Sequence, residues 1–325
     1  MIGKLIKGLV KALAGLLLLA ILVLAGFRIA ASVRETETAV PSGLRSVATP
    51  LGAVTVEVAG PADGPPVMIV PGTAGWSGFW RNVTRHLAAK GWRVIAVDLP
   101  PFGFSERDPR ARYGRRDQAA RLAAVLAAEA RSPAVVIGHS FGGGPATELA
   151  LLAPGRVRSL VLVDAALGTL DPAPAGRWSA DRIVRPAWVA EPVVSASLTN
   201  PLAIGTLMRS MLARRDAADP WIETIRLPMR RSGTTAGYAD WLPFLLTADD
   251  GAASRRSAGL ARIRVPVALI WGEADTVTPI AQGETIARLT RARSLIRLPG
   301  VGHVPHIEDE PAFLRALDAA MGAAQ

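Results

Sequence analysis

The chain has 325 residues, half of them hydrophobic and a fifth charged, which suits one large domain or two medium ones and excludes a disordered protein. It contains no cysteine, which excludes a disulfide scaffold, a thiolate metal site and a cysteine nucleophile. The net charge is +10, but half of this excess lies in residues 1–34 and the rest is scattered among acidic residues, so no nucleic-acid partner is expected.

The first predicted element is an apolar helix at the N-terminus. Residues 12–27 carry no charge and follow three lysines. Such a helix covers about 24 Å, and flanking apolar residues extend it toward the roughly 30 Å of a hydrocarbon core. The cation bias predicts a cytoplasmic tail over 1–8, an uncleaved signal anchor over 9–31, and a remainder outside the cytoplasm, periplasmic in a bacterium. The lipid bilayer is therefore an expected partner.

Two other interpretations fit the same segment. The small residues at 30–32 (Ala-Ala-Ser) suit a cleaved signal peptide, and an apolar run is also compatible with a buried core helix. Residues 32–46 are polar and include Pro41 and Gly43, so they are predicted to form a linker to the folded part.

Apolar runs then alternate with helical patterns. Near-continuous Val, Ile and Leu runs, each followed by helical spacing, indicate a parallel sheet covered on both faces. The core is predicted to comprise 47–166 and 258–325. The strand-like runs lie at 53–59, 67–70, 92–99, 134–138, 157–164, 265–272 and 294–298, and the helical patterns at 77–90, 115–131, 141–153, 279–290 and 310–321.

The alternation breaks between the two parts of this core. Residues 167–257 carry Pro and Trp at irregular spacing and contain no strand-like run. This pattern predicts short helices inserted into the sheet protein.

The strand over 134–138 runs directly into Gly138-His139-Ser140-Phe141-Gly142 and then a helix. This is a Gly-x-Ser-x-Gly pattern between a strand and a helix, where a tight turn lifts the serine hydroxyl above the sheet. The turn also points the Phe141 backbone N–H toward a developing oxyanion. The alternative is a helix cap by Ser140. The context favours Ser140 as a nucleophile.

A serine nucleophile needs a base, and the chain has four histidines. His303 follows the last strand in a loop with two glycines, at the edge of the sheet where Ser140 lies. His306 is its rival. His86 lies within a predicted helix, and the His139 side chain is expected to point away from the hydroxyl. The base is therefore predicted to be His303.

The base in turn needs a carboxylate to orient it. Asp275 follows the penultimate strand, which gives the chain order serine, acid, histidine. Asp164, at the end of another strand, and Glu273 remain as alternatives. A second oxyanion donor is expected in the glycine-containing loop after 67–70, from the N–H of Thr73 or else of Ala74.

With Ser140, Asp275 and His303 in this order, the chain resembles the α/β-hydrolase superfamily. The segment 98–105 (DLPPFGFS) is similar to the family's D-x-P-G-x-G-x-S pattern, and 302–303 (Gly-His) matches its final loop. The resemblance implies a mostly parallel eight-stranded sheet with helices on both faces, a helical cap over 167–257, and neither cofactor nor metal. Two positions depart from the pattern: Pro71 replaces a histidine in the oxyanion loop, and Pro101 replaces a glycine.

The nucleophile type narrows the predicted reaction. Relatives that open epoxides or displace halide use aspartate at the elbow, so Ser140 points to acyl transfer. The expected function is hydrolysis of an apolar carboxylic ester by a membrane-anchored enzyme. Hydrolytic cleavage of a C–C bond in a vinylogous diketone, perhydrolysis, and a non-catalytic binding protein are the alternatives.

Overall fold

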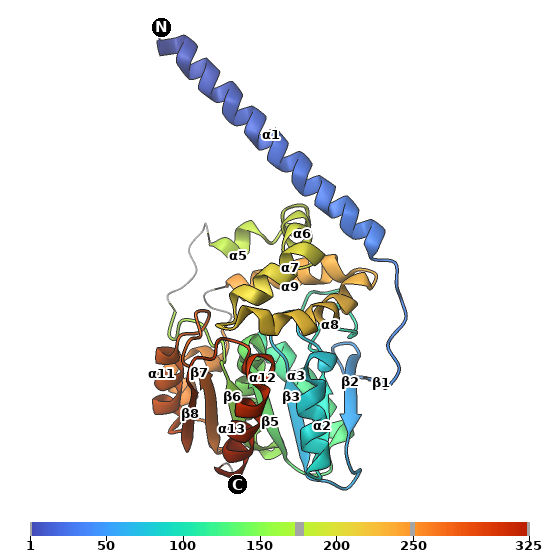
Figure 1. Cartoon of the computed structure of the whole chain (residues 1–325), viewed down its shortest axis with the longest axis vertical. Helices are drawn as coiled ribbons and strands as arrows, with labels where there is room; N and C mark the ends of the chain where they lie inside the picture. Colours follow the sequence, from blue (N-terminus) through green and yellow to red (C-terminus); the bar gives the residue numbers. More distant parts are fainter. Residues whose placement is uncertain (1, 173–178, 248–250, 324–325) are drawn as a thin grey trace.

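The computed structural model describes residues 2–172, 179–247 and 251–323. Its centre is an eight-stranded sheet in the order β1-β2-β4-β3-β5-β6-β7-β8, with helices on both faces (Figure 1). β2 runs antiparallel to β1 and β4, and the other neighbouring strands are parallel. The strands are β1 (Leu44–Val47), β2 (Val54–Ala59), β3 (Pro66–Val70), β4 (Arg93–Val97), β5 (Ala134–His139), β6 (Val157–Val163), β7 (Val267–Gly272) and β8 (Ser294–Leu298).

An apolar layer on each face holds the helices against the sheet. In β3, Met68 and Val70 belong to one layer and Val67 and Ile69 to the other. The first layer includes α3, α4 and α11, and the second includes α2 and α13. Because both faces are covered, β3 and β5 are buried along their whole length. These helices are α2 (Arg81–Ala89), α3 (Arg115–Glu129), α4 (Gly143–Leu152), α11 (Ile280–Thr290) and α13 (Glu310–Ala323), with α12 (Pro305–Glu308) before the last.

The fold class predicted from the sequence is confirmed, and each of the seven strand-like runs forms a strand of the sheet. The remaining strand, β1, is not evident from the sequence. It is an edge strand in which Arg45 and Ser46 are exposed, so it lacks the continuous apolar run that marks the buried strands.

The chain between β6 and β7 is mainly helical, and α5 to α9 are called the cap below. The cap lies over the carboxyl ends of the parallel strands (Figure 1). Residues 173–178 and 248–250 of the predicted insert lie outside the described residues, and the described part of it holds no β-strand. The cap helices are α5 (Ala180–Ile183), α6 (Ala187–Ala196), α7 (Pro201–Ser210), α8 (Ile222–Arg226) and α9 (Thr234–Leu246), followed by α10 (Ser257–Leu260).

Short 3-10 helices connect several of these elements. They are η1 (Ser77–Trp80), η2 (Ser140–Gly142), η3 (Pro154–Arg156), η4 (Arg215–Trp221), η5 (Leu227–Arg230) and η6 (Ala253–Arg255). Of these, η1 and η2 follow directly on the strand ends that carry the site described below.

The N-terminal helix α1 (Ile2–Arg34) projects away from the rest of the molecule (Figure 1). From Ile6 to Arg34 it is long and apolar enough to cross a membrane, and its apolar window is not buried in the protein. A buried core helix is therefore wrong for this segment. A spanning helix and a signal sequence both remain compatible with it.

The predicted linker over 32–46 is wrong at both ends. α1 continues to Arg34, because its last turn holds no helix breaker, and β1 begins at Leu44. Between them, the Glu37 backbone exchanges hydrogen bonds with the cap: its N–H donates to the Arg230 carbonyl at 3.0 Å, and its carbonyl accepts from the Ser232 N–H at 2.9 Å. This segment is thus fixed to the cap.

Candidate active site

Ser140 lies at the tight turn between β5 and η2. Its φ is +48°, a left-handed conformation that is costly for a residue other than glycine and must be held by its surroundings. A Cβ on Gly138 would lie 2.7 Å from the Cβ of Ala146, and a Cβ on Gly142 would lie 2.3 Å from the Pro71 carbonyl oxygen. The turn therefore requires glycine two residues before and two residues after the serine.

Side chains from three separate loops form one hydrogen-bonded chain. Ser140 Oγ lies 2.8 Å from His303 Nε2, and His303 Nδ1 lies 2.8 Å from Asp275 Oδ2. All three residues are buried. When the proton of neutral His303 is on Nδ1, that N–H donates a hydrogen bond to the carboxylate. Nε2 is then unprotonated and accepts a hydrogen bond from the serine hydroxyl. The structure thus brings together the three residues that the sequence singles out.

The Asp275 carboxylate is held by the turn that follows β7. Its Oδ1 accepts from the N–H groups of Val277 at 2.7 Å and Thr278 at 2.9 Å, and its Oδ2 accepts from the Thr278 hydroxyl at 2.6 Å. Burial alone raises the pKa of Asp275, but the hydrogen bonds from His303 and Thr278 outweigh it and hold the pKa below its ordinary value. Asp275 is therefore ionised at neutral pH.

The two alternative acids have different surroundings. Asp164, at the end of β6, is fully buried, and its Oδ1 accepts from the Gly272 N–H at 2.8 Å. Burial, reinforced by the neighbouring Asp275 charge, raises the pKa of Asp164 well above its ordinary range. Glu273 lies at the surface with a carboxylate oxygen 4.0 Å from the Arg297 guanidinium. Asp275 is thus the ionised carboxylate that contacts His303.

The other histidines make different contacts. His86 pairs at 3.0 Å with a carboxylate of α13, and His306 is buried and stacks on Trp80 with ring centroids 3.8 Å apart. His139 Nε2 donates to the His303 carbonyl oxygen at 2.9 Å. Burial, with a smaller effect of His303, lowers the pKa of His139 to about 3, so it is neutral. His139 therefore supports the backbone of the His303 loop.

The loop after β3 approaches the serine from the other side. Thr73, Ala74 and Phe141 line the cavity at Ser140. A Cβ on Gly72 would lie 2.8 Å from the Ser140 Cβ, so only glycine permits this close approach. The segments that carry the predicted N–H donors, Thr73 and Phe141, therefore both border the hydroxyl.

Asp98 braces this loop, a role that was not evident from its sequence pattern. Its Oδ1 accepts from the Ser77 N–H at 2.7 Å, and its Oδ2 accepts from the Phe104 N–H at 2.8 Å. Burial raises the pKa of Asp98 to about 6. A Cβ on Gly103 would lie 2.3 Å from Oδ2, which explains the glycine in this segment. Asp98 thus ties the loop after β3 to the loop after β4.

A cavity of about 260 Å³ opens at Ser140 between the strand ends and the cap. Among the residues that the structure describes, no Lys, Arg, Asp or Glu lines this cavity, and the surface of the cavity is almost entirely apolar. Its size lies near the lower end of ligand pockets, which span about 300–1,000 Å³. The cap and its neighbouring loops contribute Leu198, Ile204, Leu207, Met208, Met211, Ile225 and Leu245, and the core contributes Phe79, Val277 and Val304.

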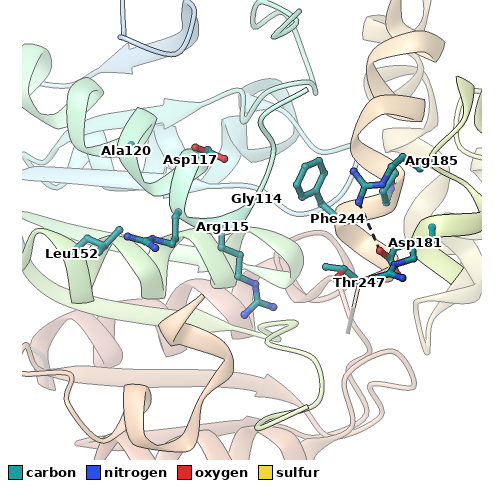
Figure 2. Close-up of a pocket in the computed structure, with 12 residues that line it drawn as sticks. Gly114, Arg115, Asp117, Ala120, Leu152, Asp181, Arg185, Phe244 and Thr247 are labelled. Atoms are coloured by element: carbon teal, nitrogen blue, oxygen red, sulfur yellow. Dashed lines mark ion pairs between the residues drawn. The ribbon is translucent and has the colours of Figure 1, made fainter. Parts of the chain in front are cut away.

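A second cavity, of about 700 Å³, lies between α3 and the cap and is lined by charged groups (Figure 2). Among them are Arg115, Asp117 and an ion pair of Arg185 with Asp181 at 3.8 Å. The Ser–His–Asp chain does not line it. The chemistry of the lining, rather than the volume, therefore identifies the candidate site.

Glu308 is a further residue whose role the sequence does not reveal. Its buried carboxylate accepts from the Gly302 N–H at 2.8 Å and from the Arg214 N–H at 2.8 Å. The His303 N–H donates to the Met211 carbonyl at 2.9 Å. Glu308 and these backbone contacts join the histidine loop to the chain that follows α7. Such links form between distant segments and leave no local signal.

The alpha/beta hydrolase fold family matches residues 65–310, which is more than half of the chain. The chain belongs to this family. It is therefore a hydrolase of the α/β fold, with Ser140, His303 and Asp275 inside the matched region. Among the described residues, no group of three or more His, Asp or Glu is arranged to hold a metal ion.

Several relatives match most of the chain, and two of them illustrate the range of their reactions. It is 30% identical over 259 residues to the pimeloyl-[acyl-carrier protein] methyl ester esterase of Chromobacterium violaceum, covering 78% of this chain and 93% of that protein. It is 27% identical over 259 residues to the 2-hydroxy-6-oxo-2,4-heptadienoate hydrolase of Pseudomonas putida, covering 78% and 88%. Among solved structures, a membrane phospholipase A superposes over 99% of this chain and 97% of its own, with a TM-score of 0.63 and 21% identity, a likeness of fold.

Proposed function

We propose that the protein is a membrane-anchored serine hydrolase that cleaves an apolar carboxylic ester through an acyl-enzyme on Ser140. The observation that carries this proposal is the hydrogen-bonded chain from Ser140 through His303 to Asp275, at the floor of an apolar cavity. His303 acts as the base, and Asp275 orients it and stabilises the imidazolium that forms.

The proposed reaction has two steps. Ser140 Oγ attacks the ester carbonyl carbon while its proton passes to His303 Nε2, and the carbonyl oxygen becomes an oxyanion facing the N–H groups of Phe141 and Thr73. Each such donor typically contributes about 2.7–4 kcal/mol to transition-state stabilisation. The C–O bond then breaks, and the leaving alcohol takes the proton from His303. Water, deprotonated by His303, releases the carboxylic acid and restores Ser140.

The cavity lining favours an uncharged acyl group. A ring-fission dienoate carries a carboxylate, and burying an unpaired carboxylate is costly. The described lining offers no Arg or Lys to pair with it. This observation favours an ester over the C–C hydrolase alternative, even though several relatives are named for substrates of that class.

The proposed anchor is α1. Three lysines precede its uncharged run, and Arg28 and Arg34 follow it. Under the positive-inside rule this arrangement supports an N-terminus in the cytoplasm and a hydrolase domain outside it. Retention of α1 is expected to concentrate the enzyme beside lipid-soluble esters.

The test uses the full chain in detergent. A fluorophosphonate probe should label the wild type and leave Ser140→Ala unlabelled, and p-nitrophenyl esters of increasing acyl length should be hydrolysed faster than ring-fission dienones. An unlabelled but folded wild type would favour a non-catalytic binding protein. Faster decay of the dienone colour would favour C–C hydrolysis.

A further inference from the structure

The cap carries large apolar side chains that the protein does not cover. Trp188 on α6 is 80% exposed, Leu202 on α7 is 79% exposed, and Ile183 on α5 is 53% exposed. Large exposed apolar side chains mark contact surfaces, and tryptophan and tyrosine are enriched at membrane–water interfaces. Trp188 and Ile183, which precedes it in the chain, are called the outer cap surface below.

α6, which carries Trp188, packs against α1 at the end of the cap away from the sheet (Figure 1). Arg28 Nε of α1 lies 2.5 Å from Glu191 Oε2 of α6, and the Arg34 guanidinium donates to the Thr199 carbonyl at 2.6 Å. Ala31, between these two contacts, is fully buried. α1 packs against α6 along this stretch. The membrane helix is therefore joined to the cap at several points.

The order of these contacts sets the depth of the cap. Going from Arg28 to Arg34 on α1 corresponds to going from Glu191 to Thr199 on the cap, so the two segments run in the same direction. Arg28 ends the uncharged run and belongs at headgroup level. Trp188 precedes Glu191 by one helical turn, about 4.5 Å along the axis. Trp188 is thus on the membrane side of the Arg28 contact.

We propose that the outer cap surface rests in the lipid bilayer that holds α1. This inference depends on the proposed membrane anchor. The bilayer is the occupant that the contacts favour, because α6, which carries the exposed Trp188, packs against the end of α1 and the Arg28–Glu191 ion pair fixes it there.

The absence of cysteine allows a direct test on the full chain. Trp188→Cys is spin-labelled and placed in phosphatidylcholine–phosphatidylglycerol vesicles, and collision of the label with oxygen is compared with collision with a water-soluble nickel chelate. Leu22→Cys on α1 is the membrane reference, and Asp63→Cys, exposed in the loop before β3, is the aqueous reference. Oxygen should dominate at 188 as at 22, and nickel should dominate at 63.

Three results would overturn the inference in distinguishable ways. Nickel dominance at 188 with oxygen dominance at 22 would leave the anchor standing and place the cap in water. Nickel dominance at 22 would remove the anchor, and the inference with it. Dipolar broadening at 188, with low collision rates for both reagents, would show that a second copy covers the surface.

A functional measurement accompanies the spin labels. Because Trp188 is exposed, the Trp188→Asp variant should fold normally and hydrolyse a water-soluble short ester at the wild-type rate. Its rate of hydrolysis of an ester embedded in vesicles should fall several-fold. Leu152→Asp, an exposed apolar residue on α4, is the matched control and should keep both rates. Equal rates for the two variants on the vesicle substrate would contradict a bilayer contact.

Discussion

The strand ends of the sheet and the helices of the cap contribute differently to the cavity. The sheet supplies Ser140, Asp275 and His303, each fixed by short hydrogen bonds to its own loop or its neighbours. The cap supplies apolar walls such as Leu207 and Met208, which give the cavity its shape and carry no charge. This difference indicates that the chemistry is set by the sheet and the choice of substrate by the cap.

The largest expected loss of activity follows from a substitution at the strand ends of the sheet. Ser140→Ala should lower kcat by about 10⁶-fold, since the nucleophile is lost while the cavity remains. Steady-state kinetics on a p-nitrophenyl ester measure the effect, with circular dichroism as the check on folding. Activity within a small factor of wild type in a folded variant would mean that another group attacks the ester.

The next effect separates the two buried acids. Asp275→Asn should lower kcat by about 10⁴-fold, because an amide cannot hold the required histidine tautomer. Asp164→Asn is the matched control and should lower kcat only modestly, since burial and Asp275 raise the pKa of Asp164 and keep it neutral. A larger loss for Asp164→Asn than for Asp275→Asn would reverse the assignment of the acid.

A smaller effect, on the preference for acyl-chain length, is expected from a substitution in the cap. Leu207→Trp should shorten the cavity and shift the preference from long to short acyl chains by about tenfold or more, the scale of a few methylene contacts. Leu246→Trp is the control, because Leu246 is equally exposed on the same cap but does not line the cavity. An equal shift in both variants would show that the cap acts through its overall packing.

The smallest effect concerns stability rather than activity. Burial lowers the pKa of His306 well below its ordinary value, so below about pH 6.5 the unfolded chain binds a proton that the folded chain excludes. The contribution of His306 to the free energy of unfolding therefore falls as the pH drops, by up to about 1.4 kcal/mol per pH unit. His306→Phe should reduce the slope of the free energy of unfolding between pH 6.5 and 4, leaving the part that comes from buried His139. Trp80→Phe, in the same cluster, should keep the slope.

The sequence predicts the sheet and the Ser–His–Asp chain because both depend on local pattern. Buried parallel strands require continuous apolar runs, and Ser140, Asp275 and His303 each lie in the turn or loop that follows a strand. β1 escapes prediction because an edge strand with Arg45 exposed needs no such run. The supporting contacts of Glu308, like the pairing of Arg28 with Glu191, join residues far apart in the chain and depend on packing alone.

The measurement that tests the central claim most directly is the mass of the full-length protein during turnover. Rapid acid quenching of wild type mixed with a p-nitrophenyl ester should show a mass increase of one acyl group, mapped by peptide fragmentation to Ser140, and Ser140→Ala should show none. Turnover of the ester without any acyl adduct, or an adduct on another residue, would contradict the proposed acyl-enzyme.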